Sequence, residues 1–436
     1  MKKIIRKLVP KYIINAYHWA LAKLGAFIYG RPSSRLIVIG VTGTKGKSTT
    51  VSMISKILEQ AGYITGLIST INFKIADREW INTTKQTMPG RWHLQKLLSQ
   101  ISSAGCQYAI IETSSEGIAQ FRHLGIEYDV AVFTNLSPEH IESHGSYEKY
   151  REAKSKLFIR LKNNKNKIIS GKEVKKVIVT NLDDKESSFF AGFEADEKWG
   201  YSLESPDHNP DIKTNLITGR SVVVHSDSTE FTVDNVSFEL QLLGRFNVYN
   251  AIAAIAVGYS QGVELLEMKQ ALEKITSVPG RMDEISNNRG FRIFVDYAHE
   301  PASLEAVYKT IKDFKPNKII SILGSQGGGR DKAKRPILGK LAAQYTDHVI
   351  VTNEDPYDED PQQIIDDVAA GALSIIKHPP IEKIADREEA IKRALDIAQV
   401  NDIVIITGKG SETVMAVKDG KMVDWNDRQV VEKYIK

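Results

Sequence analysis

The first stretch able to do chemistry is GVTGTKGKST, residues 40–49, which follows an apolar run and precedes an amphipathic helical pattern. Backbone N–H groups of such a glycine-rich turn, with the N-terminus of the helix after it, bind phosphate oxygens. Lys47 would reach the terminal phosphates, and Ser48 would ligate Mg²⁺. Five residues rather than four separate Gly40 from Gly46, so the strict P-loop spacing is not met. An ordinary βα turn is the alternative, but the order of strand, turn and helix predicts a nucleotide site.

A second set of chemical groups follows four apolar runs in the last third of the chain. The strings are DYAHEP (296–301), GSQGGGRDKAKRP (324–336), NEDPYDEDP (353–361) and GKGSE (408–412). Open α/β sheets bind ligands outside the carboxyl ends of their strands. We therefore expect the four strings to converge on one site.

The elements that must position these groups alternate from residue 36 onward between short apolar strands and helical patterns, which is typical of mostly parallel α/β layers. A polar, antiparallel insertion is expected at about 195–240, and SVPGRMDEI (277–285) marks a domain junction. We predict a basic amphipathic helical extension over 1–35, a central P-loop-type ATPase domain over 36–277, and a Rossmann-like doubly wound domain over 278–436.

Composition narrows the class of protein. The 436 residues exceed what one core organises, and a single cysteine, Cys106, excludes an intramolecular disulfide and suits the reducing cytoplasm. The net charge of +4 is uneven, because residues 1–35 hold eight Lys and Arg and no acid, while the remainder holds 50 Lys and Arg against 54 Asp and Glu. This distribution argues against a nucleic-acid partner for the main body.

The basic segment 1–30 resembles neither a signal peptide nor a membrane span, because Pro10, Lys11, His18 and Lys23 interrupt it. Its aromatic residues suggest helices that lie on a surface. Two hypotheses remain: the segment packs on its own domain, or it makes peripheral contact with anionic lipid at the inner membrane surface.

Several strings resemble the Mur ligase family, in that family's order. Besides the glycine-rich turn, they are ETSSEG (112–117), TNLSPEHIESHGSYEKYREAKSKLF (134–158), GRFNVYNAIAAIA (244–256), DYAHEPASLE (296–305) and GGGRDKAKRP (327–336). The resemblance covers about residues 36–420 and is closest to the UDP-N-acetylmuramoyl-tripeptide synthetases, which add the third residue of the peptidoglycan stem peptide. It implies an ADP-forming ligase that uses ATP to activate a muramoyl-dipeptide carboxylate as an acyl phosphate, which the amino group of an amino acid then attacks.

The resemblance also implies roles for particular residues. Glu112 with Ser48 would hold one Mg²⁺, His140 a second, and Lys154 matches a lysine that related ligases carbamylate on its side-chain nitrogen. Without that context, a buried strand-end glutamate, a capping histidine and a surface lysine are the simpler interpretations. The implied catalytic residues are Lys47, Glu112, His140 and Lys154. The implied nucleotide contacts are Gly43, Thr44, Lys45, Gly46, Lys47, Ser48, Thr49, Asn247, Asn250, Arg281, Asp296, Tyr297 and His299, with ATP between two domains and a hinge at about 277–281.

Substrate residues are implied in the same way. The segment TTKQTMPGRWHL (83–94) resembles the family's acceptor-peptide segment, with an ordinary polar loop as the alternative. The implied acceptor contacts are Thr83, Thr84 and Arg91, and those to the incoming amino acid are Glu354, Asp355, Tyr357, Gly408 and Glu412.

The identity of the added amino acid depends on residue 357. Family members that add meso-diaminopimelate carry Asp-Asn-Pro-Arg, whose arginine binds the distal carboxylate, whereas this chain has Glu354, Asp355, Pro356 and Tyr357. Tyrosine cannot form a bidentate charged pair with a carboxylate. The acidic string suits a substrate ammonium instead, which favours L-lysine or a similar diamine, although a solvated acidic loop remains the alternative. Ser411 also departs from the family's Gly-Lys-Gly-His-Glu.

The front of the chain departs further. Members of this branch carry a uridine-binding domain of about 100 residues before the ATP loop, and about 36 residues stand there in this chain. We expect either another mode of holding UDP or a lipid-linked acceptor. A folylpolyglutamate synthetase-like ligase is one alternative, disfavoured by TNLSPEHIESHG and NEDP. The other is a non-catalytic nucleotide-binding partner of a cell-wall amidotransferase, disfavoured by Lys47, Glu112, His140 and Lys154.

Overall fold

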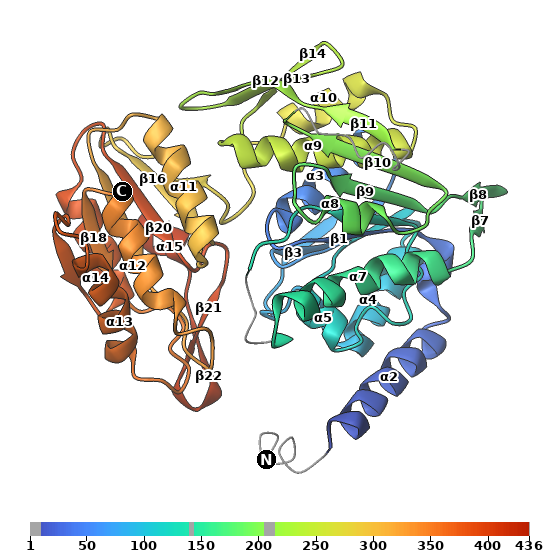
Figure 1. The fold of residues 1–436 in the computed structure, drawn as a ribbon, viewed down its shortest axis with the longest axis horizontal. Coiled ribbons are helices and arrows are strands. Elements are labelled where there is room, and N and C mark those ends of the chain that lie inside the picture. Colours follow the sequence, from blue (N-terminus) through green and yellow to red (C-terminus); the bar gives the residue numbers. More distant parts are fainter. Residues whose placement is uncertain (1–9, 139–143, 205–213, 436) are drawn as a thin grey trace. The chain divides into compact units, whose positions relative to one another are not determined.

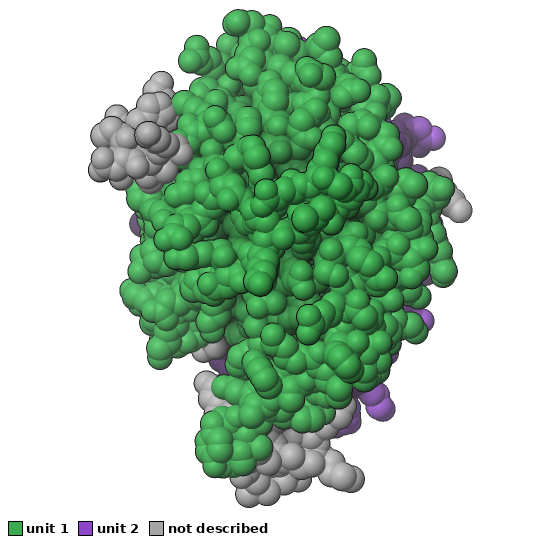
Figure 2. Space-filling view, turned by 90° about the vertical axis from the view of Figure 1, so that its right-hand side faces the viewer, with its two compact units in different colours: residues 1–222, 231–238, 247–274 green, residues 223–230, 239–246, 275–436 purple. Residues whose placement is uncertain are grey.

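The computed structural model describes residues 10–138, 144–204 and 214–435, and the chain divides into two compact units (Figures 1 and 2). Unit 1 comprises residues 1–222, 231–238 and 247–274, and unit 2 comprises residues 223–230, 239–246 and 275–436. Each unit contains a mostly parallel sheet with helices packed on it. The predicted α/β fold class is therefore confirmed.

Unit 1 is built on a nine-stranded sheet. Across the sheet the strands are β11 (Asn215–Thr218), β10 (Glu197–Ser202), β9 (Val177–Asn181), β6 (Val130–Phe133), β1 (Ile37–Thr42), β5 (Tyr108–Glu112), β2 (Thr65–Ile68), β3 (Asn72–Ile75) and β4 (Arg78–Ile81). All neighbours are parallel except the pairs β2–β3 and β3–β4, which form an antiparallel edge. The central strands are buried along nearly their whole length, as expected for parallel strands covered on both faces.

Helices cover both faces of this sheet. On one face lie α4 (Arg91–Ser103), α5 (Ser115–Ala119), α7 (Tyr147–Asn163) and α8 (Ser187–Ala191). On the other lie α3 (Lys47–Gln60), α9 (Arg245–Ser260) and α10 (Leu265–Glu273) (Figure 1). Side chains alternate between the two faces along a strand. Val38 of β1 and Ile111 of β5 lie on the face that α4, α5, α7 and α8 cover.

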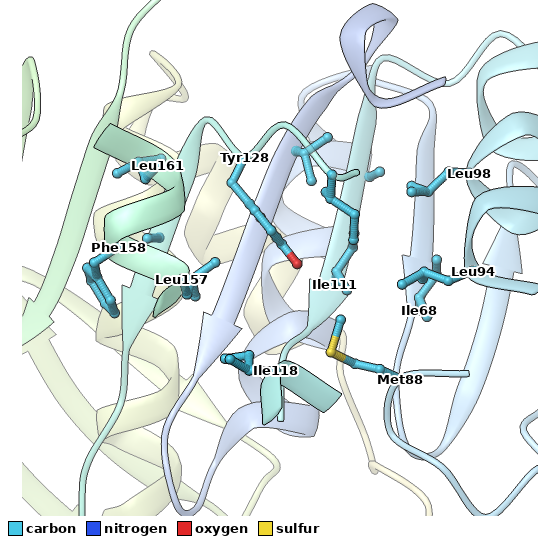
Figure 3. Close-up of a cluster of buried hydrophobic side chains, with 14 of the residues drawn as sticks. Ile68, Met88, Leu94, Leu98, Ile111, Ile118, Tyr128, Leu157, Phe158 and Leu161 are labelled. Atoms are coloured by element: carbon cyan, nitrogen blue, oxygen red, sulfur yellow. The ribbon is translucent and has the colours of Figure 1, made fainter. Parts of the chain in front are cut away.

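The core between α4, α7 and the sheet fixes the elements that carry the chemistry. Figure 3 shows Leu157 and Phe158 of α7 and Leu94 of α4 reaching toward the same sheet face, with the Tyr128 ring between the two helices. A Cβ on Gly40 would lie 2.7 Å from the Tyr128 ring and 2.9 Å from Leu157. Only glycine therefore lets α7 pack this closely against β1.

The expected antiparallel insertion at 195–240 is only partly correct. β10 pairs in parallel with β9, and β11 pairs in parallel with β10, so residues 197–202 and 215–218 extend the main sheet. The second part forms a separate three-stranded sheet of β12 (Arg220–Val224), β13 (Thr229–Val233) and β14 (Val236–Leu240). The polar sequence of β10 and β11 reflects their place near the sheet edge, where side chains are partly exposed.

Unit 2 has a six-stranded sheet. Across it the strands are β15 (Asp283–Glu284), β16 (Arg292–Asp296), β20 (Ile403–Thr407), β17 (Ile319–Leu323), β18 (His348–Val351) and β19 (Ile381–Lys383). Only β15 runs antiparallel to its neighbour. One face is covered by α11 (Pro301–Asp313), α12 (Lys334–Tyr345) and α13 (Pro361–Leu373), the other by α14 (Arg387–Ile397) and α15 (Asp427–Tyr434). This is the expected doubly wound arrangement.

The remaining described elements are one long helix, short 3-10 turns and hairpins. They are the helix α2 (Lys11–Ile28), the 3-10 turns η1 (Pro32–Arg35) and η2 (Lys418–Gly420), and the hairpins β7 (Lys167–Ile169) with β8 (Lys172–Val174) and β21 (Val414–Val417) with β22 (Lys421–Asp424). Within the described ranges, no helix combines the length and the apolar character that crossing a bilayer requires.

Candidate active site

The glycine-rich turn closes around the N-terminus of α3. Gly43 and Gly46 have φ values of +152° and +78°, and a Cβ at either position would overlap its neighbours, Thr134 Oγ1 at 1.9 Å and Asn250 Oδ1 at 2.2 Å. Thr44 and Lys45 donate their backbone N–H groups to the carbonyl and the side-chain oxygen of Asn135. The turn is therefore held in one shape, which only glycine permits at two positions.

Glu112 connects this turn to the rest of unit 1. It is the last residue of β5 and is 2% exposed. Its Oε2 accepts hydrogen bonds from Ser48 Oγ at 2.9 Å and from the backbone N–H of Thr70 at 2.8 Å. Thr70 Oγ1 in turn donates to Thr87 Oγ1 at 2.9 Å. Three consecutive hydrogen bonds thus run from the start of α3, beside the glycine-rich turn, to segment 83–94.

Lysines lie on the carbonyl side of the turn. Lys154 of α7 is 1% exposed, and its Nζ donates to the Gly43 carbonyl at 2.7 Å while lying 4.5 Å from the centre of the Tyr150 ring. Lys47 Nζ donates to the Thr44 carbonyl at 2.9 Å. A surface position for Lys154, the simpler interpretation of the sequence, is therefore wrong.

Asn247 and Asn250 come to the turn from α9, some 200 residues later in the chain. Asn250 Oδ1 accepts from Thr50 Oγ1 at 3.3 Å, and Asn250 Nδ2 donates to Asn247 Oδ1 at 3.0 Å. Both asparagines are buried behind Gly46. They shape the turn from behind, and their predicted contact with nucleotide stays a prediction.

The donor set fits Mg²⁺ in part. A serine hydroxyl and a carboxylate 2.9 Å apart, at the start of a helix beside a glycine cradle, are hard oxygen donors of the kind that Mg²⁺ combines with phosphate oxygens. In the described ranges no three His, Cys, Asp or Glu side chains group in a way that would hold a metal by themselves. His140, the predicted second ligand, lies outside the described residues.

The predicted acceptor segment lies next to Glu112. Thr84 Oγ1 and its N–H both bond Asn82 Oδ1, and the Asn82 amide donates to the Ser69 and Gln86 carbonyls. Arg91, at the start of α4, donates to the Gln120 carbonyl. Thr83 is exposed. The structure thus folds this segment as an ordered turn.

Thr70 and Thr87 were not singled out by sequence reasoning. A single threonine belongs to no motif with a characteristic spacing, so the sequence does not point to it. The hydrogen bonds that link Thr70 and Thr87 to Glu112 depend on the tertiary position of the loop after β2, which ends at Ile68.

In unit 2 the four polar strings converge as predicted. The Gly408 N–H donates to the Asp296 carbonyl at 3.1 Å, and the Gly327 N–H donates to the Asp355 carbonyl at 2.8 Å. A Cβ on Gly408 would lie 2.3 Å from Glu354 Oε2. The strings after β16, β17, β18 and β20 are therefore in direct contact at one edge of the sheet.

Arg281, Tyr297 and His299 form one cluster beside Asp296. The Arg281 guanidinium lies 4.6 Å from the centre of the Tyr297 ring, which meets the His299 ring edge-on at 4.6 Å. Both carboxylate oxygens of Asp296 accept backbone N–H groups, from Met282 and from Ala298, each at 2.7 Å. Burial raises the pKa of Asp296. This carboxylate therefore ties β16 to the domain junction, and its predicted role in binding ATP stays a prediction.

Among the described residues, the acids predicted to contact the incoming amino acid differ in their partners: Asp355 and Glu412 bond a lysine, and Glu354 does not. Asp355 accepts from Lys409 Nζ at 2.9 Å, and the same ammonium bonds Glu412 at 2.5 Å. Glu354 is fully buried, and neither of its carboxylate oxygens has a hydrogen-bond partner among the residues that the structure describes. Burial raises its pKa to about 7, and the nearby cations Arg387 and Lys409 oppose that rise.

Tyr357 lies in a left-handed conformation, with φ of 54°, against the backbone of Gly328. Arg330, from the glycine-rich string after β17, lies beside the Tyr357 hydroxyl and opposes the rise in its pKa that burial causes. Arg330 and Lys409 are further residues of this cluster that the sequence analysis did not identify. In the two strings that contain them, only the glycines and the acids were assigned roles.

Two family descriptions match this chain: Mur ligase middle domain over residues 41–258, and Mur ligase, glutamate ligase domain over residues 280–410. The chain belongs to the Mur ligase family. As a Mur ligase it is an ATP-dependent, ADP-forming ligase of peptidoglycan precursor synthesis. The predicted family and enzyme class are confirmed.

Named relatives show how similar this Mur ligase is to other members. UDP-N-acetylmuramoyl-L-alanyl-D-glutamate--2,6-diaminopimelate ligase of Bacillus cereus is 37% identical over 432 residues, which are 98% of this chain and 84% of the relative. UDP-N-acetylmuramyl-tripeptide synthetase of Roseiflexus sp. is 38% identical over 414 residues, 93% of this chain and 79% of the relative.

Solved structures agree with this placement. A UDP-N-acetylmuramoyl-L-alanyl-D-glutamate--2,6-diaminopimelate ligase superposes with a TM-score of 0.59 at 31% identity, covering 92% of this chain and 78% of that one. A folylpolyglutamate synthase of Mycobacterium tuberculosis has a TM-score of 0.66 at 14% identity, covering 89% and 92%. The second likeness shows the shared fold alone.

Proposed function

We propose that this Mur ligase adds the third amino acid to a muramoyl dipeptide. The observation that carries the proposal is the chain of hydrogen bonds from Ser48 through Glu112 and Thr70 to Thr87. It joins the phosphate-binding turn directly to the segment that resembles the family's acceptor-binding segment. The carboxylate to be activated and the phosphate that activates it would then lie within reach of the same residues.

The residues divide the work of this reaction. The turn from Gly43 to Thr49 and the N-terminus of α3 bind the phosphates, with Lys47 released from the Thr44 carbonyl to neutralise the transferred phosphoryl group. Ser48 and Glu112 would hold Mg²⁺, which shields charge on the phosphates when it is bound. The acceptor carboxylate takes the phosphoryl group from ATP and releases ADP. The amine then attacks the acyl carbon, phosphate leaves, and the amine loses a proton.

Thr87 provides a direct test of acceptor binding. Thr87→Val keeps the side-chain shape but removes the hydroxyl that accepts from Thr70. We expect the KM for the muramoyl acceptor to rise while the KM for ATP stays unchanged. Thr232→Val, which removes an exposed hydroxyl in β13, is the matched control and should change neither. Equal effects of the two variants would contradict the assignment of segment 83–94.

Lys154 is proposed to act in its carbamylated form. Carbamylation would replace an ammonium beside the turn with a carboxylate-like group able to orient metal. The test removes CO₂ and bicarbonate from the assay, and separately adds a short carboxylic acid to a Lys154→Ala variant. We expect the first change to slow the native enzyme and the second to restore part of the lost rate. If neither change alters the rate, Lys154 acts unmodified.

For the incoming amino acid, L-lysine or a similar diamine is proposed. Tyr357 stands where the resemblance places arginine, and Glu354 offers a carboxylate without a hydrogen-bond partner among the described residues. Meso-diaminopimelate is the second candidate, because the Bacillus cereus relative is named for that substrate. Arg330 beside Tyr357 would supply a cation for its distal carboxylate.

One assay tests the reaction and the choice of amino acid together. The chain is incubated with ATP and Mg²⁺, with UDP-linked or lipid-linked muramoyl dipeptide, and with lysine, ornithine or meso-diaminopimelate. Mass spectrometry of the products should show an amide with lysine or ornithine in preference to meso-diaminopimelate. Preference for meso-diaminopimelate would overturn the choice of amino acid. Glutamate addition to a folate, with no muramoyl product, would overturn the proposed function.

We place the reaction in the cytoplasm. The supply of ATP and the single cysteine, Cys106, both suit that compartment.

A further inference from the structure

Helix α2 packs on unit 1 through small residues. Ala22 and Ala26 are buried, and Gly25 lies between them on the same face. A Cβ on Gly125 would lie 2.8 Å from the Cβ of Ala26 and 3.0 Å from the Ala22 carbonyl. Small residues therefore let the inner face of α2 pack closely on unit 1.

Five large apolar side chains of α2 point the other way. Phe27 is 72% exposed, and Ile13, Tyr17, Leu24 and Ile28 are exposed to a lesser degree. Because successive residues are about 100° apart on a helix, these five lie within about 60° of the direction opposite Ala22, whereas the exposed Tyr12 and Trp19 lie on the side of Ala22. We call this set of five side chains the outer face of α2. In Figure 1 the N-terminal end of α2 extends away from the other elements of unit 1.

The elements next to the outer face contain cations but no acids. Neither α2 nor its neighbour α4 contains an aspartate or glutamate. In the sequence, residues 1–35 hold eight Lys and Arg without an acid, of which Lys23, Arg31 and Arg35 are described by the structure as exposed. Lys23 lies at the edge of the outer face and is exposed. Trp92 of α4 lies on the inner side of α2, where its ring meets the Tyr29 ring at 5.5 Å.

This combination fits a lipid surface better than a second copy of the chain. Aromatic and aliphatic side chains flanked by lysine match the boundary between lipid headgroups and acyl chains, and anionic headgroups attract the cations. A second copy docked on the same face would bring the two Lys23 side chains together, with no acid in α2 or α4 to pair with them.

We propose that the outer face of α2 docks on anionic phospholipid, with the helix lying in the plane of the bilayer surface. The proposal concerns peripheral contact, because no described helix is long and apolar enough to span a bilayer. It does not depend on the proposed ligase activity, since it rests on the exposed side chains and charge of α2 alone.

The test is flotation of the full chain with vesicles. We expect the protein to rise with phosphatidylglycerol vesicles, to rise less at high salt, and to remain behind with phosphatidylcholine vesicles. Replacing two outer-face residues, Leu24→Ser with Phe27→Ser, should weaken binding about tenfold or more, since binding scales with buried apolar area. Both positions are exposed, so folding should persist, and circular dichroism checks it.

A matched control is Ile376→Ser, which removes an apolar side chain that is 99% exposed in unit 2. It should leave vesicle binding unchanged. The proposal is overturned if the native chain does not rise with anionic vesicles, or if both variants bind equally well. It is also overturned if light scattering shows a dimer that the α2 variant abolishes while vesicles do not bind.

Discussion

At the scale of single residues, the carboxylate of Glu112 joins three segments of unit 1. It accepts hydrogen bonds from Ser48 and Thr70 while almost fully buried. Glu112→Gln keeps the size of the side chain but removes the charge that would bind Mg²⁺. We expect kcat to fall by about 100-fold or more, as is typical when one charge-stabilising group is removed from an active site.

The measurement is the rate of ATP-dependent phosphate release at saturating substrates. Glu194→Gln is the control, because Glu194 is exposed and pairs with Lys162 at the surface. A Glu112→Gln variant that retains the rate of the control would show that Glu112 is a structural strand-end residue, the simpler interpretation of the sequence.

A second residue, Glu354, gives a prediction about stability and pH. Burial raises its pKa to about 7 in the folded state, above its ordinary value. Between these two values the folded protein holds a proton that the unfolded chain has released, so the free energy of unfolding falls as pH rises through this window. The loss is of order 3 kcal/mol. Glu354→Gln removes the titrating group and should raise the melting temperature at about pH 8 but not at about pH 5.

Thermal unfolding followed by circular dichroism at both pH values checks this. Glu389→Gln, which alters an exposed carboxylate of the same unit, should shift the melting temperature little at either pH. If Glu354→Gln has the same effect at both pH values, the Glu354 carboxyl does not change its charge between about pH 5 and about pH 8, which would contradict the raised pKa.

Residue-level prediction from sequence was uneven for physical reasons. Gly43, Gly46 and Glu112 stand in motifs whose spacing reflects a required geometry, so the sequence alone points to them. Thr70 carries no such signal, because its role depends on the tertiary position of its N–H group. The acidic string 354–360 suits a substrate ammonium by composition, but Asp355 pairs with Lys409 and Glu359 pairs with Arg335, which local sequence does not encode.

At the scale of elements, the join between β1 and α3 requires a left-handed residue at 46. In Gly46→Ala, the new Cβ would lie 2.2 Å from Asn250 Oδ1. We expect a loss of about 1–2 kcal/mol in the free energy of unfolding from backbone strain, and a larger loss of ATP binding because α9 must move. Isothermal titration with ATP and chemical denaturation measure the two effects.

Gly62 at the other end of α3 is the matched control. It also has a positive φ, +85°, but a Cβ there would meet nothing within 4 Å. Gly62→Ala should lower stability by a similar strain while leaving ATP binding intact. Equal losses of ATP binding in the two variants would mean that the turn does not form the phosphate site.

Strands could be predicted from the sequence where every side chain of the strand is buried and the strand is therefore a continuous apolar run. The strands 108–112 and 403–407 are buried at every residue, and their apolar runs identify them. β4 and β10 are exposed or partly exposed along much of their length, so their sequences resemble loops. The parallel direction of β10 depends on its pairing with β9, which no local pattern encodes.

At the scale of the whole molecule, both units place their polar site residues in the loops that follow parallel strands. In unit 1 the polar groups follow β1 and β5, and in unit 2 they follow β16, β17, β18 and β20, always at the carboxyl ends of parallel strands. Such ends gather loops from distant parts of the chain. The fold class was therefore predictable from the alternation of strands and helices, whereas the contacts between loops required the structure.

The central claim is that ATP is spent only to join an amino acid to a carboxylate. The most direct measurement compares phosphate release with ATP alone, with muramoyl dipeptide, with amino acid, and with both, in the native chain and in Lys47→Ala. We expect release only when both substrates are present, with one phosphate for each amide formed, and no release in Lys47→Ala. Release that is independent of either substrate, or amide formation that persists in Lys47→Ala, would contradict it.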